Sequence, residues 1–184
     1  LRGRLAGADA EATDQHLAAW QQVVEAIAHV HSCGWCHRDV KPENVLLDSN
    51  GVARLCDFGF AAPSALPLAG AVGSAGYLAP EMLTCPSYDG KAADMWSLGT
   101  LLVEITIGSD NFDHIFIING PFSPSAVSDM DSFKQRMYQA LTQVNNILKE
   151  KQEPRTAQIR RVVRKLLRMQ PSHRATSVDG DLME

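Results

Sequence analysis

The chain has 184 residues, of which 45% are hydrophobic and 21% charged, and its formal net charge is −4. This composition is that of an ordinary globular protein, long enough for one domain with a core. The acidic balance does not favour a nucleic-acid or membrane-surface partner, and no apolar run has the length of a membrane-spanning helix.

We expect the four cysteines to be reduced thiols. Cys33, Cys36, Cys56 and Cys85 lie in a chain with no visible secretory signal. Thiols of such chains stay reduced in the cytoplasm or the nucleus. An intracellular location, cytoplasmic or nuclear, is expected on the same ground.

A helix is predicted from Thr13 or Asp14 to His31, because apolar residues recur there at helical spacing. Thr13 or Asp14 is expected to cap its start, and Gly34 is a stop signal just after its end. The apolar positions are Leu17, Trp20, Val23, Val24, Ile27 and Val30.

Residues 33–37 form the pattern C-x-x-C-H, which is typical of c-type haem attachment and contains a possible redox or metal-binding cysteine pair. The other interpretation is that Cys33 and Cys36 flank a turn, and that His37 belongs to the motif that follows. The sequence has no second cysteine pair for a zinc site and no thioredoxin-like strand before this one. The second interpretation is therefore favoured.

The chain is organised around residues 37–44, with the sequence HRDVKPEN. Asp39 offers a carboxylate that can act as a general base, and Lys41 offers an ammonium two residues later. Asn44 adds a carboxamide oxygen, and Asp57 adds a second carboxylate at the start of a DFG triplet. A base, a cation and two oxygen ligands for a metal thus fall within a short stretch.

Two short β-type runs, residues 45–47 and 52–55, separate Asn44 from Asp57. Between them lies an Asn-Gly pair at residues 50–51, which is a strong hairpin signal. A hairpin here would carry Asn44 at one end and Asp57 at the other. This arrangement gives a structural reason for both side chains to face one metal site.

The rest of the chain is predicted to be a loop followed by helices. Residues 60–78 have loop composition, and residues 92–107 and 132–151 have helical patterns. Residues 108–130, with two prolines, are expected to be irregular. A last apolar stripe runs over residues 159–167, and its opposite basic face is interpreted as solvated rather than as an anion-binding surface.

Three motifs in order resemble the signature of protein kinases, which contains H-R-D-L-x-x-x-N, D-F-G and A-P-E. This chain has HRDV with Asn44 at 37–44, DFG at 57–59 and APE at 79–81. Residues 94–99 resemble the kinase D-x-W-S-x-G motif, and residues 171–176 resemble P-x-x-R-x-[ST]. The chain is similar to the C-terminal lobe of a eukaryotic-type serine/threonine protein kinase catalytic domain.

The resemblance implies catalytic roles for three residues. Asp39 would orient and deprotonate the substrate hydroxyl, and Lys41 would neutralise charge on the transferred phosphate. Ser74 matches the Ser or Thr found near the catalytic aspartate of serine/threonine kinases.

The resemblance also implies a nucleotide site and a metal site. ATP would be bound with the help of Lys41, Glu43, Asn44 and Asp57. Asn44 and Asp57 would hold Mg²⁺, a hard ion that prefers oxygen ligands. Cys56 directly precedes Asp57, and its thiol either lines the nucleotide pocket or is an inert buried thiol.

Other motif residues would have supporting roles. Glu81 and Arg174 correspond to a structural ion pair of the family, and Asp94 corresponds to the residue that anchors the backbone of the catalytic loop. His37 and Phe58 would be packing residues of the regulatory spine.

One expected feature of the family is missing. Arg38 before the catalytic aspartate is typical of kinases that are controlled by activation-loop phosphorylation, through an Arg–phosphate pair. Between Gly59 and Gly73, however, Ser64 is the only hydroxyl, and Gly70 falls near the position of the usual activating threonine. Control by that route is therefore not expected.

The fold implied is mainly α (α+β), a kinase-like C-lobe built as a helical bundle with short β-hairpins at the catalytic and metal-binding loops. Residues 1–12 would connect it to an N-lobe, residues 13–178 would form the C-lobe, and residues 179–184 a frayed tail. The sequence contains no G-x-G-x-x-G loop and no V-A-I-K-type lysine. A fragment of a longer kinase is therefore expected, with little activity by itself.

The functional expectation is phosphoryl transfer from ATP to protein Ser or Thr hydroxyls, with no nucleic-acid or membrane partner and with the oligomeric state left open. The alternative is a catalytically inactive kinase-like binding or scaffold module, because the N-lobe motifs are missing and residues 108–130 are unusual. A tyrosine kinase is disfavoured by the sequence KPEN at 41–44.

Overall fold

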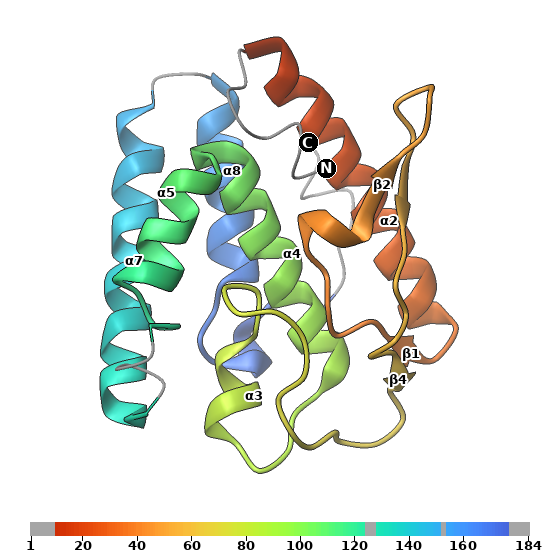
Figure 1. The fold of residues 1–184 in the computed structure, drawn as a ribbon, viewed down its shortest axis with the longest axis vertical. Helices are drawn as coiled ribbons and strands as arrows, with labels where there is room; N and C mark the ends of the chain where they lie inside the picture. Colours follow the sequence, from red (N-terminus) through yellow and green to blue (C-terminus); the bar gives the residue numbers. More distant parts are fainter. Residues whose placement is uncertain (1–9, 124–127, 152–153, 177–184) are drawn as a thin grey trace.

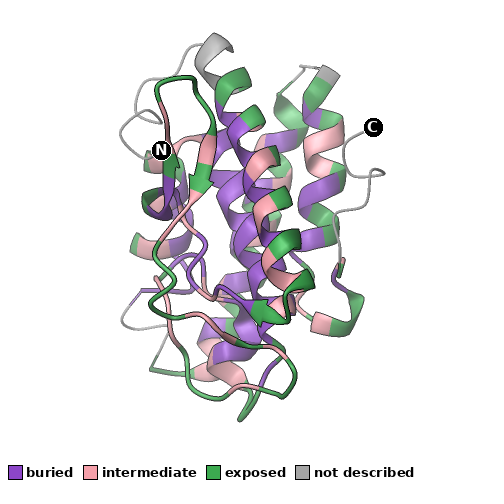
Figure 2. Cartoon of the chain, turned by 90° about the vertical axis from the view of Figure 1, so that its right-hand side faces the viewer, coloured by how far each residue is buried: buried purple, intermediate pink, exposed green. Residues whose placement is uncertain are grey.

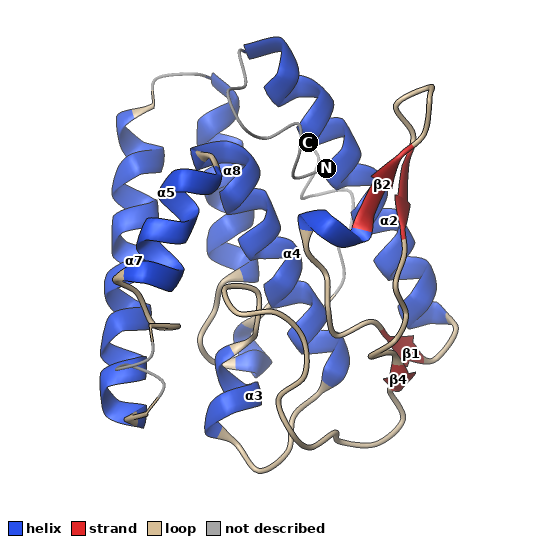
Figure 3. Ribbon diagram, viewed as in Figure 1, coloured by secondary structure: helices blue, strands red, loops and turns tan. Residues whose placement is uncertain are grey.

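The computed structural model describes residues 10–123, 128–151 and 154–176. This part of the chain is mostly helical, with two small antiparallel sheets of two strands each (Figure 3). The long helices are α2 (Ala10–Ser32), α4 (Gly90–Ile107), α7 (Met130–Glu150) and α8 (Pro154–Leu166). The short helices are α3 (Pro80–Thr84), α5 (Ser109–Asp113), the 3₁₀ helices η1 (Pro42–Asn44) and η3 (Pro171–His173), and the π-helix η2 (His114–Ile118). The strands are β1 (Trp35–Cys36), β2 (Val45–Leu47), β3 (Ala53–Leu55) and β4 (Ala62–Pro63).

Helix α4 is the central element of the core. It is apolar on nearly all sides, and its residues from Ala92 to Ile107 are all buried between α2, α7 and α8 (Figures 1 and 2). Gly99 lets α8 approach closely, because a Cβ there would lie 2.7 Å from a methyl carbon of Leu167. Burial of each large apolar side chain stabilises the fold by about 1.5–3 kcal/mol. The many buried side chains of α4 therefore fix the positions of the helices that pack against it. Among the described helices, none is long and apolar enough to cross a membrane.

The ends of the long helices differ from the predicted ends by a few residues. Helix α2 begins at Ala10, so the prediction that Thr13 or Asp14 caps its start is wrong. Of the expected connection at 1–12, residues 1–9 lie outside the described part of the chain, and residues 10–12 belong to α2. The expected tail at 179–184 also lies outside it. Helix α7 begins after Asp129, whose carboxylate accepts hydrogen bonds from the first-turn amides.

Residues 109–118 are helical, which corrects the prediction of irregular structure over 108–130. Phe112, Ile115 and Phe116 are spaced i, i+3, i+4 and are buried against the core. The rings of Phe112 and Phe116 stack with centroids 4.8 Å apart. The segment turns at Gly120, where a Cβ would lie 1.9 Å from the carbonyl oxygen of Ile115. Burial of this apolar face outweighs the loop-like composition around it.

The predicted hairpin is confirmed. Strands β2 and β3 pair antiparallel, with Val45 opposite Leu55, and the hairpin stands beside α2 (Figure 1). The carboxylate of Asp48 accepts hydrogen bonds of 2.9 Å from the backbone N–H groups of Val52 and Asn50 in the turn. These bonds, that of Val52 first, lower the pKa of Asp48. The turn therefore favours an ionised Asp48 and sets the register that pairs the two ends of the hairpin.

Candidate active site

The backbone at the start of the HRDVKPEN stretch is held by a carboxylate from the core helix. Asp94 of α4 accepts a 2.8 Å hydrogen bond from the amide of His37 at Oδ2 and a 2.7 Å bond from the amide of Arg38 at Oδ1. Arg38 has φ 69°, in the left-handed region that costs a non-glycine residue about 1–3 kcal/mol. Two charge-assisted hydrogen bonds, which the buried carboxylate of Asp94 accepts, stabilise this conformation, as expected for Asp94 from the resemblance.

Asp39 is a buried carboxylate with one oxygen paired and the other without a partner. Its Oδ2 lies 2.8 Å from Lys41 Nζ and accepts a 3.0 Å hydrogen bond from Asn44 Nδ2. Its Oδ1 is buried and has no hydrogen-bond partner among the described residues. A buried acceptor without a partner is costly. The arrangement is suited to an incoming hydroxyl group, which would satisfy that oxygen.

Lys41 links the HRDVKPEN stretch to the loop that follows the DFG triplet. Its ammonium donates a 2.6 Å hydrogen bond to the hydroxyl of Ser74, as well as contacting Asp39. Glu43 is exposed and lines the same cavity of about 430 Å³ as Lys41 and Ser74. The structure thus brings the predicted catalytic residues together beside a hollow that is open to a substrate.

Gly73 allows that loop to lie directly on the catalytic stretch. Its φ is 111°, and a Cβ at this position would lie 2.5 Å from the carbonyl oxygen of Arg38 and 3.4 Å from Asp39 Oδ1. No side chain fits in this space. The contact brings the chain within reach of the carboxylate and places Ser74 next to Lys41.

Asn44 and Asp57 are joined by the hairpin, as the sequence predicted. The amide of Cys56 donates a 2.9 Å hydrogen bond to the carbonyl of Asn44, which closes the open end of the hairpin. Asn44 Nδ2 donates to the backbone oxygen and to Oδ2 of Asp39, so the carboxamide oxygen is left as its possible ligand atom. Asp57 has φ 60° and is exposed, and its Oδ1 accepts a 3.2 Å bond from the amide of Gly59.

The donor atoms at this end of the hairpin fit Mg²⁺. Both are oxygens, a carboxamide and a carboxylate, and Mg²⁺ is commonly bound by one or two protein oxygens together with substrate phosphates and water. Within the described residues there is no group of three or more His, Cys, Asp or Glu side chains that could hold a metal ion by themselves.

The C-x-x-C-H pattern has a structural explanation. Cys33 is exposed, whereas Cys36 is fully buried and donates a 3.3 Å hydrogen bond to the carbonyl of Ala62. Burial, and then the nearby carboxylate of Asp94, raise the pKa of the Cys36 thiol to about 11. His37 is also buried, with Nε2 3.0 Å from the carbonyl oxygen of Cys56. Because the Cys36 thiol and the His37 imidazole are both held in the core, the interpretation that Cys33 and Cys36 only flank a turn is favoured over haem attachment or a redox pair.

Glu81 and Arg174 form a buried bidentate ion pair. The two nitrogen–oxygen distances are 2.6 and 2.9 Å, and Arg174 also lies over the ring of Trp96, 5.1 Å from its centroid. The pair ties the APE motif to Arg174, 93 residues later. The side chains expected to pair from the resemblance therefore do so.

Sequence reasoning missed two polar contacts near the site. The hydroxyl of Tyr77 donates to the buried carboxylate of Glu104 in α4, and His31 Nε2 lies 2.8 Å from Asp94 Oδ2. Glu104 in an otherwise apolar helix was a visible signal, because a buried carboxylate needs a partner. The partner itself could not be found from spacing, since Tyr77 is 27 residues away.

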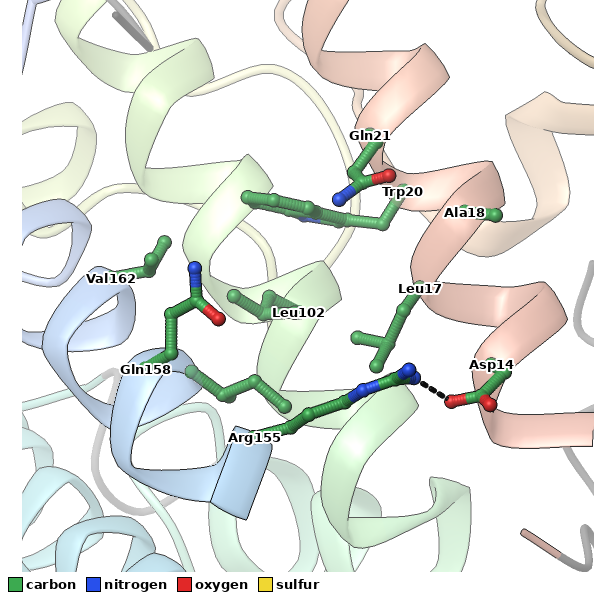
Figure 4. A pocket seen from close by; sticks show the side chains of 10 residues that line it. Asp14, Leu17, Ala18, Trp20, Gln21, Leu102, Arg155, Gln158 and Val162 are labelled. Atoms are coloured by element: carbon green, nitrogen blue, oxygen red, sulfur yellow. Dashed lines mark hydrogen bonds and ion pairs between the residues drawn. The ribbon is translucent and has the colours of Figure 1, made fainter. Parts of the chain in front are cut away.

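A second cavity, of about 400 Å³, lies away from all these residues. It is formed by α2, α4 and α8, with Leu17 and Leu102 on its walls and an ion pair between Arg155 and Asp14 at its edge (Figure 4). It contains none of the predicted site residues. The convergence of the Asp39 carboxylate, the Lys41 ammonium and the Asn44 carboxamide makes the HRDVKPEN stretch the better candidate site.

Comparison with known proteins agrees with these motifs. A family model described as "Protein kinase domain" matches residues 7–180. CBL-interacting serine/threonine-protein kinase 24 of Arabidopsis thaliana is 48% identical over 95 residues, which are 48% of this chain and 21% of that protein. Serine/threonine-protein kinase SAPK1 of Oryza sativa subsp. japonica is 39% identical over 114 residues, which are 60% of this chain and 33% of that protein. Serine/threonine-protein kinase SRK2C of Arabidopsis thaliana is 38% identical over 118 residues, 61% of this chain and 34% of that protein. The matched part thus spans between about a fifth and a third of these relatives' length.

Proposed function

Because this chain belongs to the protein kinase domain family, we propose that it transfers the γ-phosphate of ATP to serine or threonine hydroxyls of proteins. One observation carries the proposal. Asp39 is a buried carboxylate that has one oxygen without a partner among the described residues, and the ammonium of Lys41 lies beside the other oxygen. This pair suits a reaction in which a hydroxyl loses a proton while a phosphate carries developing charge.

Each residue of the proposed site has a role that follows from its contacts. Asp39 Oδ1 accepts the hydrogen bond, and then the proton, of the substrate hydroxyl. Lys41 offsets negative charge on the transferred phosphate, and Ser74 holds the Lys41 ammonium in place through the 2.6 Å hydrogen bond. The bond between Lys41 and Ser74 also supports the serine/threonine class over the tyrosine class.

The proposed cofactors are ATP and Mg²⁺. Asn44 and Asp57 hold the metal ion through their side-chain oxygens, and Lys41 and Glu43 complete the nucleotide site on the catalytic side. When bound, Mg²⁺ would neutralise negative charge on the phosphates. The hydrogen bond from the amide of Cys56 to the carbonyl of Asn44 supports this pairing, because it ties the residue before Asp57 to Asn44.

We further propose that residues 13–178 act as the C-lobe of a two-lobed kinase. Large apolar side chains are exposed around the metal end of the hairpin, with Leu46 56% and Phe58 49% exposed. Exposed apolar groups of this size next to a polar site are expected where another domain packs. A strand-rich lobe with a Gly-rich loop would cover them and form the roof of the ATP pocket.

The test is a phosphotransfer assay on the protein expressed from its complete coding sequence, with labelled ATP, Mg²⁺ and a generic Ser/Thr protein substrate. Asp39→Asn is expected to lower the rate by at least about a hundredfold, because it removes the base. Asp131→Asn, at an exposed site on α7, is the matched control and should leave the rate unchanged. Phosphoamino-acid analysis should find phosphoserine or phosphothreonine.

Two results would overturn the proposal. One is an Asp39→Asn variant as active as the wild type. The other is a wild-type protein that neither transfers phosphate nor binds ATP in an Mg²⁺-dependent way, and this result would favour the inactive scaffold.

A further inference from the structure

Arg38 contacts neutral groups where its family typically has a phosphate. Its Nε donates a 2.7 Å hydrogen bond to the carbonyl of Phe60, and its Nη1 donates a 3.3 Å bond to the hydroxyl of Tyr88. Within the described part of the chain it forms no ion pair with a carboxylate. The loop at 59–73 has no acidic residue, and Ser64 is its only hydroxyl. The loop itself therefore offers the guanidinium almost no anionic partner.

Tyr88 holds this loop by its backbone and by its side chain. Its amide and carbonyl exchange 2.8 Å hydrogen bonds with those of Leu68 in an isolated antiparallel bridge. Its hydroxyl donates a 3.2 Å bond to the carbonyl of Gly70 while it accepts the bond from Arg38. A phenol has one donor and can accept as well, so both capacities are used. Tyr88 is also buried, at 4% exposure, which keeps water from replacing these partners.

These contacts connect the loop to both halves of the proposed site. Arg38 directly precedes Asp39, and its backbone is in the left-handed conformation that Asp94 stabilises. Phe60, the other acceptor of the guanidinium, lies three residues after Asp57. Gly70, whose carbonyl accepts the hydrogen bond of the Tyr88 hydroxyl, has φ 75° and carries no side chain. One guanidinium thus links the segment with the proposed base, the segment with the proposed metal ligand and, through Tyr88, the loop at 59–73.

We propose that Tyr88 is a positioning residue that takes the place of an activating phosphate. Its hydroxyl orients Arg38 and fixes the loop at Gly70, so the catalytic segment is ordered without phosphorylation of the loop. The inference rests on the proposed kinase function. It predicts a kinase that is active as synthesised, and whose activity depends on a tyrosine outside the loop.

The experiment uses the protein from its complete coding sequence, in four forms: wild type, Tyr88→Phe, Ser64→Ala and the matched control Tyr138→Phe. Tyr138 is an exposed tyrosine of α7. Tyr88→Phe keeps the ring and removes only the hydroxyl. It is expected to lower kcat about tenfold or more, the effect of losing a hydrogen bond to a charged group. The KM values for ATP and the substrate should change less than about twofold, since no substrate contact is removed.

The other forms test whether a phosphate is needed. Phosphatase treatment of the wild type and the Ser64→Ala change should both leave kcat unchanged, as should Tyr138→Phe. Loss of activity after either phosphatase treatment or Ser64→Ala would overturn the inference. These two measurements do not depend on how well the Tyr88→Phe protein folds, and a thermal melt of each variant identifies a folding defect.

Hydrogen exchange separates this inference from the proposed function. In Tyr88→Phe, the amides of residues 66–73 should exchange faster than in the wild type, while those of α4 stay protected. Tyr138→Phe should show wild-type exchange throughout. Unchanged exchange at residues 66–73 in Tyr88→Phe overturns the role of Tyr88, whether or not the protein transfers phosphate. A protein without transferase activity that still shows the local change would contradict only the kinase proposal.

Discussion

The ammonium of Lys41 lies 2.8 Å from Asp39 Oδ2, and this contact leaves the other carboxylate oxygen buried without a partner among the described residues. The two side chains therefore share the work of the proposed site. The cation keeps the carboxylate oriented, and the second oxygen stays available to a substrate.

Removal of the Lys41 charge should impair the reaction more than the fold. Lys41→Gln is expected to lower kcat by about 10²–10³, the loss typical of removing one group that stabilises charge in a transition state. The partly buried amide would still reach Ser74, so the melting temperature should change little. Steady-state kinetics measures kcat for Lys41→Gln and for the control Lys149→Gln, which changes an exposed lysine. A kcat of Lys41→Gln within about threefold of the wild type would refute the role assigned to Lys41.

The buried pair of Glu81 and Arg174 should matter for stability, and an exposed pair should not. Arg174→Met leaves a buried carboxylate without its partner and should cost about 3–5 kcal/mol of unfolding free energy. The same change at Arg155, which is exposed and pairs with exposed Asp14, should cost less than about 1 kcal/mol. Urea unfolding measures both. Equal losses in the two variants would contradict the burial argument.

The Cys36 thiol should make the protein sensitive to alkali. Its pKa is raised by burial from 9.0 to about 11, so the folded state keeps a proton that the unfolded state loses. The stabilising contribution is complete below about pH 9 and is lost as pH rises towards 11. Cys36→Ala should lose less stability between pH 8 and about 10.5 than the wild type does. Denaturant titrations at both pH values measure this loss of stability, and Cys85→Ala, at an exposed cysteine, is the control. If Cys36→Ala loses as much stability as the wild type, the Cys36 thiol is not involved.

Gly73 should be essential for activity, unlike a glycine of similar backbone conformation in the hairpin turn. A Cβ at Gly73 would lie 2.5 Å from the carbonyl oxygen of Arg38, so Gly73→Ala must displace the loop or the catalytic stretch. We expect a fall in kcat of at least about tenfold, because small displacements of catalytic groups have large effects. Gly51 has φ 79°, and a Cβ there would meet no atom within 4 Å, so Gly51→Ala should cost only about 1 kcal/mol of stability. An active Gly73→Ala enzyme would show that the close approach is not required.

Much of the site could be predicted because it is local in sequence. The stretch at 37–44 contains the carboxylate, the cation and one oxygen ligand, and the Asn50-Gly51 turn signal predicted how Asp57 returns to Asn44. The hairpin register confirmed that prediction. Residues within one short stretch or one hairpin are related by known backbone geometry, so spacing is informative.

The helical structure of residues 109–118 could have been predicted but was not. The spacing of Phe112, Ile115 and Phe116 is a helical pattern, whereas the prolines that follow favour an irregular segment. The π-helix over His114–Ile118 is a different matter, since periodicity does not distinguish it from an α-helix. Ile115 and Phe116 within it are buried.

The sequence by itself determined the family, the order of the motifs, the identity of the base and ligand candidates, and the helical character of the core. Only the tertiary structure decided which distant groups meet. Tyr77 reaches Glu104 across 27 positions, and Tyr88 reaches Arg38 across 50. Such pairings depend on how α4 packs in the core, because packing of many side chains together sets the position of each helix. No spacing rule along the chain contains that information.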